Sequence, residues 1–349
     1  MATPSATRDR TPPIGRLTVT PSAARCRRPL VWRHGIETAA ILTLVRHYRA
    51  TVYDSDRWDG FELRPGDIII STPPKCGTTW TQMICALLIL QEPELPLPLD
   101  TLSPWLDMVT RSRTEVFAAL EAQTHRRFIK THTPLDGIPH DPTVTYICVG
   151  RDPRDVALSM DHHIDNMDFG AFLDARERAA AIDGIELGPL PPRAPRADGE
   201  RDRFWRWVDD ETPPTQIGSS LRRTVEHLQA FWAVADDLDV VYLHYDDLQA
   251  DLEGQMRQLA ARLGIDVDEH RWPRLVQAAT FESMRTRADT TVPAGGPDQW
   301  IDPAAFFFRG TSGQWRDLLD DADLARYAAR VRPLASDDLL EWVHGELID

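Results

Sequence analysis

One segment of this 349-residue chain indicates its architecture: Ile68-Ile69-Ile70-Ser71-Thr72-Pro73-Pro74-Lys75-Cys76-Gly77-Thr78-Thr79-Trp80. It opens with a short β-branched run after the turn residues 64–67, which is typical of a buried parallel strand. The residues from Trp80 to Leu90 are apolar and predict a helix. A strand, a glycine-containing turn and a helix in this order present backbone N–H groups and a helix dipole to an anion. An ordinary βα turn is the alternative interpretation.

Strand and helix signals alternate along the rest of the chain. We expect strands at 127–130, 144–149 and 240–243. We expect helices near 36–49 and at 155–163, 219–235 and 251–263. Such alternation favours an α/β fold in which helices flank a central parallel sheet.

The domain organisation follows from composition. Residues 1–35 are rich in Pro, Ser, Thr, Ala and Arg without a clear period, which predicts a disordered tail. Residues 36–349 are expected to form a single domain. The Pro/Arg-rich segment near 168–216 is interpreted as an insertion or mobile cap over the sheet.

Charge and cysteine content narrow the function. The formal net charge of −15 argues against a general nucleic-acid-binding role, and an anionic ligand would need a local basic pocket. The four cysteines lack paired spacing, which indicates free thiols in a reducing compartment and no zinc site. We find no apolar run of membrane-spanning length and no secretory signal, so we expect a cytoplasmic protein.

Lysine is almost absent, and both lysines lie in motif-like turns. Of the 39 basic Lys and Arg residues only Lys75 and Lys130 are lysines. A lysine is a compact point charge that the planar arginine fork does not always replace. The two positions therefore predict places where a small cation approaches a charged atom.

The loop around Lys75 matches neither of two familiar phosphate loops. Lys75 precedes the glycine, so the loop is not a Walker A motif. A phosphatase loop would need Arg six positions after Cys76, and position 82 is Gln. Beside Lys75 and a helix N-terminus, Cys76 is expected to have a lowered thiol pKa, although we interpret it as a passive liner of the loop.

Further candidates follow the predicted strands. Ligands of parallel sheets bind outside the carboxyl ends of strands, which places Lys130 and His132 beside the 72–79 loop. His132 could take a proton from a hydroxyl, or be a surface turn histidine. Arg151 and Ser159 suit a phosphate group, and the alternative is that Arg151 caps its own loop. Arg309, before Gly310, could bind a second phosphate through its side chain and the backbone. The alternative interpretation is an apolar segment that packs on the core and is followed by a turn.

A metal site is not expected at Asp161-His162-His163. Adjacent histidines on a helix point to different faces, so they do not share an ion.

In their order and spacing, four segments resemble the PAPS-dependent sulfotransferases, where PAPS is 3′-phosphoadenosine-5′-phosphosulfate: Thr72–Trp80, Lys130-Thr131-His132, Arg151–Ser159 and Arg309–Trp315. The resemblance extends over roughly residues 60–320. The amino-acid sequences of segments 55–61 and 103–107 are most similar to those of bacterial, actinobacterial-type members of the family, such as glycolipid sulfotransferases.

The resemblance implies a P-loop-kinase-like sulfotransferase fold and transfer of a sulfuryl group from PAPS to a hydroxyl. The products are a sulfate ester and 3′-phosphoadenosine-5′-phosphate (PAP). By resemblance, Lys75 meets the bridging oxygen, His132 deprotonates the acceptor, and Lys130 holds the sulfuryl oxygens. The remaining donor contacts implied are Cys76, Gly77, Thr78 and Thr79 at the 5′-phosphate, Arg151, Ser159, Arg309 and Gly310 at the 3′-phosphate, and Trp80, Tyr245, Phe281 and Met284 at the adenine. No metal is required, because a sulfuryl group carries less negative charge than a phosphoryl group and cationic stabilisation suffices.

The chain departs from the family pattern at three places. Cys76 stands where many relatives have Ser. Phe308 stands where a basic residue is usual, so one contact to the 3′-phosphate is missing. The Thr-Val dimerisation motif of animal members is not evident after Trp315, which leaves a homo-oligomer open.

The acceptor is expected to be a small molecule or lipid with a hydroxyl group. Apolar and aromatic residues of the expected pocket favour an apolar or lipid-bearing alcohol or phenol: Trp105, Leu106, Met108, Phe169, Phe172, Phe204 and Trp205. They could equally pack against the domain itself. Two other functions stay open, a P-loop-like nucleotide kinase and a catalytically silent nucleotide-binding module.

Overall fold

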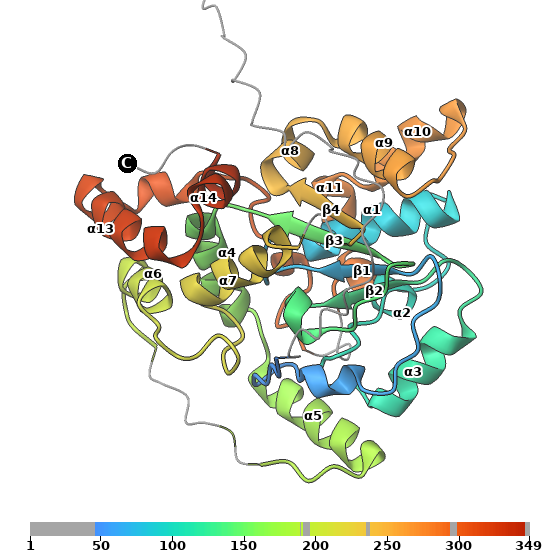
Figure 1. Ribbon diagram of the computed structural model, residues 1–349, viewed down its shortest axis with the longest axis horizontal. Coiled ribbons are helices and arrows are strands. Elements are labelled where there is room, and N and C mark those ends of the chain that lie inside the picture. The colour runs from blue at the N-terminus through green and yellow to red at the C-terminus, as the bar shows by residue number, and fades with distance from the viewer. Residues whose placement is uncertain (1–45, 189, 191–195, 235–237, 294–298, 346–349) are drawn as a thin grey trace, which may run out of the picture. The chain divides into compact units, whose positions relative to one another are not determined.

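A single parallel sheet forms the centre of the chain. The computed structural model describes residues 46–188, 190, 196–234, 238–293 and 299–345 (Figure 1). The strand order is β2-β1-β3-β4, and every neighbouring pair is parallel. The strands are β1 (Ile68–Ser71), β2 (Phe128–Thr131), β3 (Thr145–Gly150) and β4 (Val240–His244).

Helices occupy most of the remaining described chain. The α-helices are α1 (Thr78–Leu90), α2 (Leu99–Leu102), α3 (Arg113–Ala122), α4 (Pro153–Asp165), α5 (Phe169–Asp183), α6 (Glu200–Val208), α7 (Leu221–Trp232), α8 (Tyr245–Ala250), α9 (Leu252–Arg262), α10 (Trp272–Ala278), α11 (Phe281–Thr286), α12 (Ala288–Thr291), α13 (Asp321–Val331) and α14 (Asp337–His344). Short 3₁₀ turns lie at Ser55–Trp58, Leu135–Gly137, Glu269–Arg271, Ala304–Phe306, Gln314–Asp317 and Arg332–Leu334.

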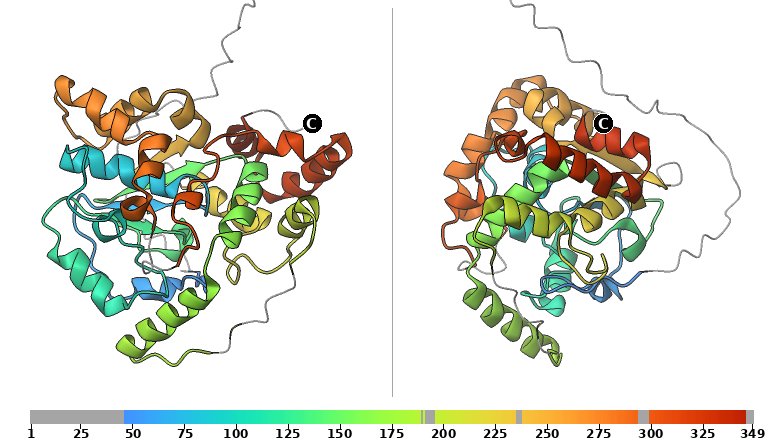
Figure 2. Two further views of the ribbon diagram at one scale, coloured as in Figure 1. Left: turned by 180° about the vertical axis from the view of Figure 1, so that it is seen from behind. Right: turned by 90° about the vertical axis from the view of Figure 1, so that its left-hand side faces the viewer.

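Helices cover both faces of the sheet (Figures 1 and 2). In β1, Ile68 and Ile70 pack in one apolar cluster with α1, α2 and α8 to α12, while Ile69 packs in another with α3, α7 and α14. Because successive side chains of a strand alternate between faces, a continuous apolar run is what a sheet buried on both sides requires. This explains why the short strands are so rich in Ile and Val.

The strand register gathers four chain segments at one edge of the sheet. Ser71 pairs with Thr131, Ile70 with Ile147, and Gly150 with His244, so the carboxyl ends lie side by side. The next residues along the chain are Thr72, His132, Arg151 and Tyr245. The topology therefore brings together the segments that the sequence singled out.

A buried ion pair joins the amino ends of β1 and β2. Arg127 Nε donates to Asp67 Oδ1 at 2.9 Å, and Arg127 Nη2 donates to Asp67 Oδ2. Both side chains are only 2% exposed, and the guanidinium lies over the Phe61 ring. The pair helps to fix the register of β1 and β2 at their amino ends, and so also the relative position of their carboxyl ends.

Most of the expected elements are confirmed. The four strands lie within one residue of their expected positions, and α1, α4, α7 and α9 lie where helices were expected, with ends shifted by a few residues. The helix expected at 36–49 lies outside the described residues up to 45, and it is wrong for 46–49, which are not helical. The tail predicted at 1–35 also lies outside the described residues. The segment 168–216 contains α5 and α6, and its role as a cap stays a prediction.

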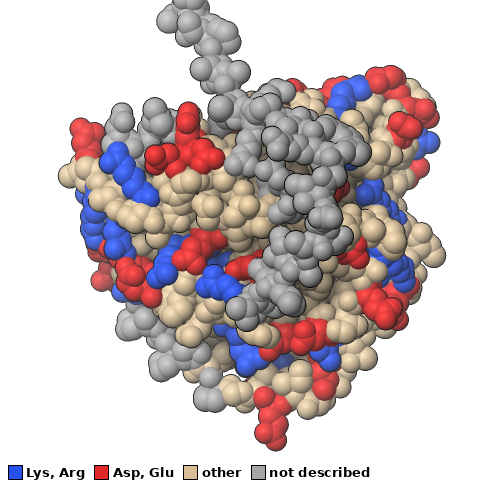
Figure 3. All heavy atoms as spheres, in the orientation of Figure 1, with Lys and Arg blue, Asp and Glu red and all other residues tan. Residues whose placement is uncertain are grey.

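The surface mixes both signs of charge. Acidic and basic side chains are interspersed on the face shown in Figure 3, so the excess negative charge is not collected in one patch there. Within the described ranges, no helix has the length and apolarity that crossing a membrane would require.

We predict that Asp67→Asn lowers the free energy of unfolding by about 3–5 kcal/mol, because it leaves the buried Arg127 charge without a counter-ion. Urea denaturation would measure the change. The matched control is Glu226→Gln, which removes an i,i+4 partner of Arg222 on the surface of α7 and should cost less than about 0.5 kcal/mol. Equal losses in the two variants would contradict this assignment.

Candidate active site

A cavity of about 350 Å³ opens at the carboxyl edge of the sheet. Its lining includes four basic side chains, Lys75, Lys130, Arg151 and Arg309. No Asp or Glu is among the described residues that line it. In a chain with a net charge of −15, this is a local site for an anion.

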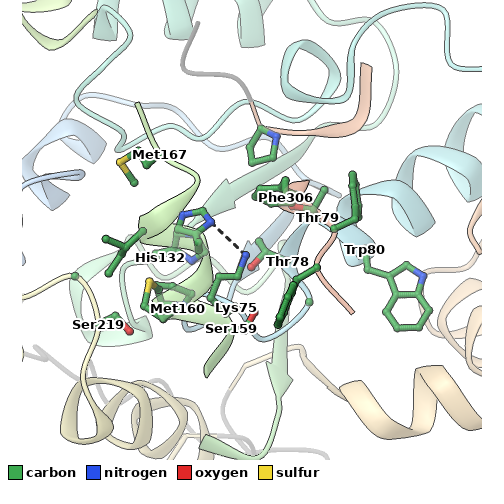
Figure 4. A pocket seen from close by; sticks show the side chains of 18 of the residues that line it. Lys75, Thr78, Thr79, Trp80, His132, Ser159, Met160, Met167, Ser219 and Phe306 are labelled. Atoms are coloured by element: carbon green, nitrogen blue, oxygen red, sulfur yellow. Dashed lines mark hydrogen bonds between the residues drawn. The ribbon is translucent and has the colours of Figure 1, made fainter. Parts of the chain in front are cut away.

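The loop between β1 and α1 has the backbone geometry of an anion cradle. Lys75 and Gly77 both have positive φ, of 68° and 100°. A Cβ added to Gly77 would lie 3.1 Å from the Tyr245 ring, so the position has little room for a side chain. No side chain caps the N-terminus of α1, which leaves its first N–H groups free to bind a ligand. Thr78 and Thr79 line the cavity at this point (Figure 4).

Both lysines lie in the cavity against aromatic rings. Lys75 Nζ is 4.4 Å from the centre of the Phe306 ring, and Lys130 Nζ is 4.3 Å from that of Trp105. Burial lowers the pKa of each to about 7, and for Lys75 the neighbouring Arg151 and Lys130 lower it further. Each ammonium is therefore costly until a negative charge arrives.

His132 is held as a neutral imidazole with a defined tautomer. Its Nδ1–H donates to the backbone oxygen of Thr72 at 2.7 Å, so Nε2 carries the lone pair. Its ring lies edge-on to Trp105, with centres 4.6 Å apart. Burial, and then the nearby Lys130, hold the pKa of His132 well below its ordinary value. A neutral imidazole with a free Nε2 can accept a proton.

Arg151 links two of the predicted phosphate-binding segments. Its Nη1 donates to the Lys75 backbone oxygen at 3.0 Å, and its Nη2 donates to that of Thr311 at 3.2 Å. The guanidinium carbon is 4.2 Å from the centre of the Tyr245 ring. Arg151 Nε is buried and has no partner among the described residues, so one donor is left for a ligand. Ser159 lines the same cavity.

Aromatic side chains form the wall beside this group. The Trp80 and Tyr245 rings are 5.5 Å apart, and Trp80 Nε1 donates to the Ala279 backbone oxygen. Gly310 has φ of 63°, and a Cβ there would come within 2.5 Å of the Phe281 ring. Met284 lines the cavity too. Together these groups offer apolar surfaces of the kind that contact a planar base.

Cys76 differs from expectation. Its side chain is completely buried, and the residue is not part of the cavity lining, so the thiol does not face the cavity. Burial raises its thiol pKa to about 12, so the expectation of a lowered pKa is wrong. Desolvation outweighs the nearby Arg151 because the side chain points into the core.

The apolar residues expected around the acceptor divide into two groups, and Phe169 is outside the cavity lining, where it stacks on Phe172. Trp105, Met108 and Phe172 line the cavity, whereas Leu106 lies in a core cluster. Phe204 and Trp205 of α6 pack in another core cluster with residues of α4, α7 and α13, so for them the alternative of packing against the domain is correct. The cavity instead takes further apolar residues from α4, α6, the segment after α4, and the segment 300–306: Ile164, Met167, Trp207, Trp300 and Phe306.

Three supporting residues were missed by sequence reasoning. Asp107 is fully buried and accepts hydrogen bonds from Thr131 and Thr133 beside His132. Asp155 accepts hydrogen bonds from the backbone N–H groups of Gly313 and Gln314, and so connects α4 to the segment Arg309–Trp315. His163 accepts from Lys75 at 3.3 Å, while its neighbour His162 stacks on Phe308. The signals in the sequence were the position of Asp107 in the 103–107 motif and the histidine pair His162-His163, which was considered only as a metal site.

Known proteins share both the sequence and the fold. A family model for the sulfotransferase domain matches residues 65–338. Glycolipid sulfotransferases of Mycobacterium bovis and Mycobacterium tuberculosis are 42% identical over 312 and 307 residues, and each alignment covers 85% of this chain and 93% of the relative.

Two solved structures share the fold at lower identity. A mouse sulfotransferase complexed with PAP has a TM-score of 0.59 at 19% identity, covering 83% of this chain and 94% of that one. A retinol dehydratase in complex with retinol and PAP has a TM-score of 0.56 at 21% identity, covering 80% and 83%.

We predict that His132 stays neutral, with the proton on Nδ1, at a pH where His47 is already protonated, because the buried and cationic surroundings of His132 oppose protonation. Nitrogen-15 NMR of the histidine side chains would show this. His47 is the internal control, since its hydrogen bond to Asp56 raises its pKa. If His132 gained its proton at a higher pH than His47, the assigned state would be wrong.

Proposed function

The chain belongs to the sulfotransferase family and is a PAPS-dependent sulfotransferase, and we propose that it sulfates a hydroxyl of a lipid-bearing acceptor such as a glycolipid. The observation that carries this proposal is the lining of the cavity, which combines four cations, no carboxylate among the described residues, and an apolar wall. The cations suit the donor's phosphates and the apolar wall suits the acceptor.

The residues present fit the donor. The uncapped N-terminus of α1 with Thr78 and Thr79 suits the 5′-phosphate, and the unpartnered Nε of Arg151 suits the 3′-phosphate together with Ser159. We assign Arg309 and Gly310 to the same phosphate. The rings of Trp80, Tyr245 and Phe281, with Met284, suit the adenine. Cys76 and Gly77 contribute through the backbone of the loop.

The chemical roles follow from the geometry of three side chains. PAPS supplies the sulfuryl group and leaves as PAP. We assign His132 Nε2 to take the proton of the acceptor hydroxyl as its oxygen bonds to sulfur. Lys75 stabilises the charge that builds on the bridging oxygen as the bond from that oxygen to sulfur breaks, and Lys130 holds the sulfuryl oxygens.

The acceptor assignment rests on two independent observations. The mycobacterial relatives that cover most of this chain are described as glycolipid sulfotransferases. The cavity lining includes Met108, Ile164, Met167 and Phe172, which favour an apolar molecule. We propose that segment 168–216 is an insertion over this cavity, since Phe172 and Trp207 line it.

The alternatives are less well supported. A nucleotide kinase would need carboxylates to hold Mg²⁺ near the phosphates, and the described lining offers none. A silent module would not need the intact Lys75, Lys130 and His132. We also propose that the enzyme works in a bacterial cytoplasm, which the free cysteines Cys76, Cys85 and Cys148 support. A homo-oligomer stays a prediction.

We predict that PAP binds in the micromolar range without metal and at least tenfold more tightly than ADP, because only PAP carries the 3′-phosphate. Arg151→Met should weaken PAP roughly 10- to 100-fold and remove most of the preference over ADP. Isothermal titration calorimetry would measure both affinities. Arg222→Met, a surface change on α7, is the control and should leave them unchanged. Equal binding of ADP to the unaltered protein would favour the kinase alternative.

We predict that His132→Ala lowers turnover roughly 100- to 10,000-fold while PAP affinity changes less than about twofold, because a general base acts on the acceptor and not on the donor. Transfer of radiolabelled sulfate from PAPS to an extracted mycobacterial glycolipid mixture would measure turnover. Turnover that survives the substitution would remove His132 from the role of base.

We predict that PAP binding at pH 8 takes up between about one and two protons, because Lys75 and Lys130, with pKa values of about 7, are mainly neutral there and become charged beside phosphate. The phosphates of PAP are already deprotonated at this pH. Affinity should therefore fall as the pH rises above 7. Calorimetry in two buffers of different ionisation heat gives the proton number, and Lys130→Met should lower it by up to one. An uptake of zero would contradict the lysine assignments.

A further inference from the structure

His163 is a second histidine in the cavity, and the proposed chemistry does not use it. Its Nδ1 lies 3.3 Å from Lys75 Nζ, the contact drawn as a dashed line at Lys75 in Figure 4. On α4 it lies one helical turn after Ser159, and residues four apart share a helix face. Both line the cavity. The helix thus presents a predicted phosphate ligand and a partner for Lys75 side by side.

The ring of His163 is held firmly by its neighbours. It lies 4.8 Å from the Trp300 ring and 5.7 Å from the Phe306 ring, measured between centres. The chain around Trp300 is in turn tied to the end of α4, because Ile301 N donates to the Asn166 backbone oxygen and Asn166 Nδ2 donates to that of Asp302. His163 is therefore a fixed acceptor for the flexible lysine side chain.

The charge state of the pair follows from its surroundings. Burial, and then Lys75 and Lys130, hold the pKa of His163 well below its ordinary value. His163 is then neutral, and the Lys75 ammonium donates to its Nδ1. The other close contact of this ammonium is the Phe306 ring. Without a donor molecule, Lys75 is thus stabilised by two groups of the apolar wall.

We propose that His163 is a positioning residue that holds the Lys75 ammonium in the donor-free site and releases it when the donor's phosphate groups enter. This rests on the proposed function. Lys75 has three N–H donors, so the competition we infer is one of position: the donor's 5′-phosphate draws the ammonium out of reach of the fixed His163 ring. The hydrogen bond to His163 stabilises the donor-free enzyme and thereby weakens donor binding. Removing this hydrogen bond should therefore strengthen donor binding.

The test compares two substitutions of His163 by their PAP affinity at pH 6.5, where Lys75 is mainly protonated. His163→Leu has no hydrogen-bond acceptor and no π-face, and we expect PAP to bind roughly three- to tenfold more tightly. His163→Gln keeps an acceptor oxygen and should bind PAP within about twofold of the unaltered protein. Thermal unfolding of each variant checks that the fold is retained.

A double-mutant cycle separates the proposed competition from a general change in packing. In a Lys75→Met background, His163→Leu should change PAP affinity less than about twofold, because no ammonium is left to hold. Binding remains measurable there through the contacts assigned to the 3′-phosphate. In the unaltered enzyme, the nitrogen-15 signal of His163 Nδ1 should shift on saturation with PAP.

Several results would overturn the proposal. They are unchanged or weaker PAP binding in a folded His163→Leu variant, equal effects of Leu and Gln, or the same tightening in the Lys75→Met background. If the unaltered protein bound no PAP at all, the proposed donor site would fail as well. PAP binding that is independent of His163 would leave the proposed function standing and remove only this inference.

Discussion

One buried carboxylate organises the end of β2, from which two of the proposed chemical groups project. Asp107 is completely buried, and it accepts from Thr131 Oγ1 and Thr133 Oγ1 at 2.5 Å each. It also accepts from the indole nitrogens of Trp58 at 3.2 Å and Trp105 at 2.5 Å. An isolated buried carboxylate would be costly, but four donors satisfy most of its lone pairs. The chain on both sides of His132 is therefore fixed by a single anion.

The contacts of Asp107 also explain how two basic groups, Lys130 and His132, can lie close together without an acidic partner in the cavity. Trp105, held by Asp107, offers the face of its indole to Lys130 and lies edge-on to the His132 ring. Its π-system stabilises the ammonium, and its bulk excludes water from the imidazole. The carboxylate acts from behind the wall, so it supports Lys130 by its field while leaving the cavity itself free of negative charge. An anionic ligand consequently meets no repulsion there.

The fold was largely predictable because its signals are local, while much of the site was not. The Ile68–Ser71 run, the glycine turn and the alternation of strands and helices are readable one segment at a time, and the parallel sheet then places Thr72, His132 and Arg151 at one edge. The roles of Asp107 and His163 depend on contacts between segments 24 to 88 residues apart, which no local pattern reports. Cys76 was misjudged for the same reason, since the sequence placed it beside a lysine but could not show that its side chain turns into the core.

The pocket's electrostatics make donor binding and protein stability opposing demands. Lowering the pKa of Lys75 from 10.5 to about 7 corresponds to about 5 kcal/mol by which burial, and then the neighbouring Arg151 and Lys130, disfavour the ammonium over the neutral amine. A carboxylate in the cavity would relieve that cost, but it would also compete with the donor's phosphates for the lysine. A neutral histidine relieves part of it without adding a charge, because its hydrogen bond is weaker than an ion pair and easier to exchange. An imidazole at position 163 thus suits a lysine that must be stabilised in the donor-free site and yet remain available to an incoming anion.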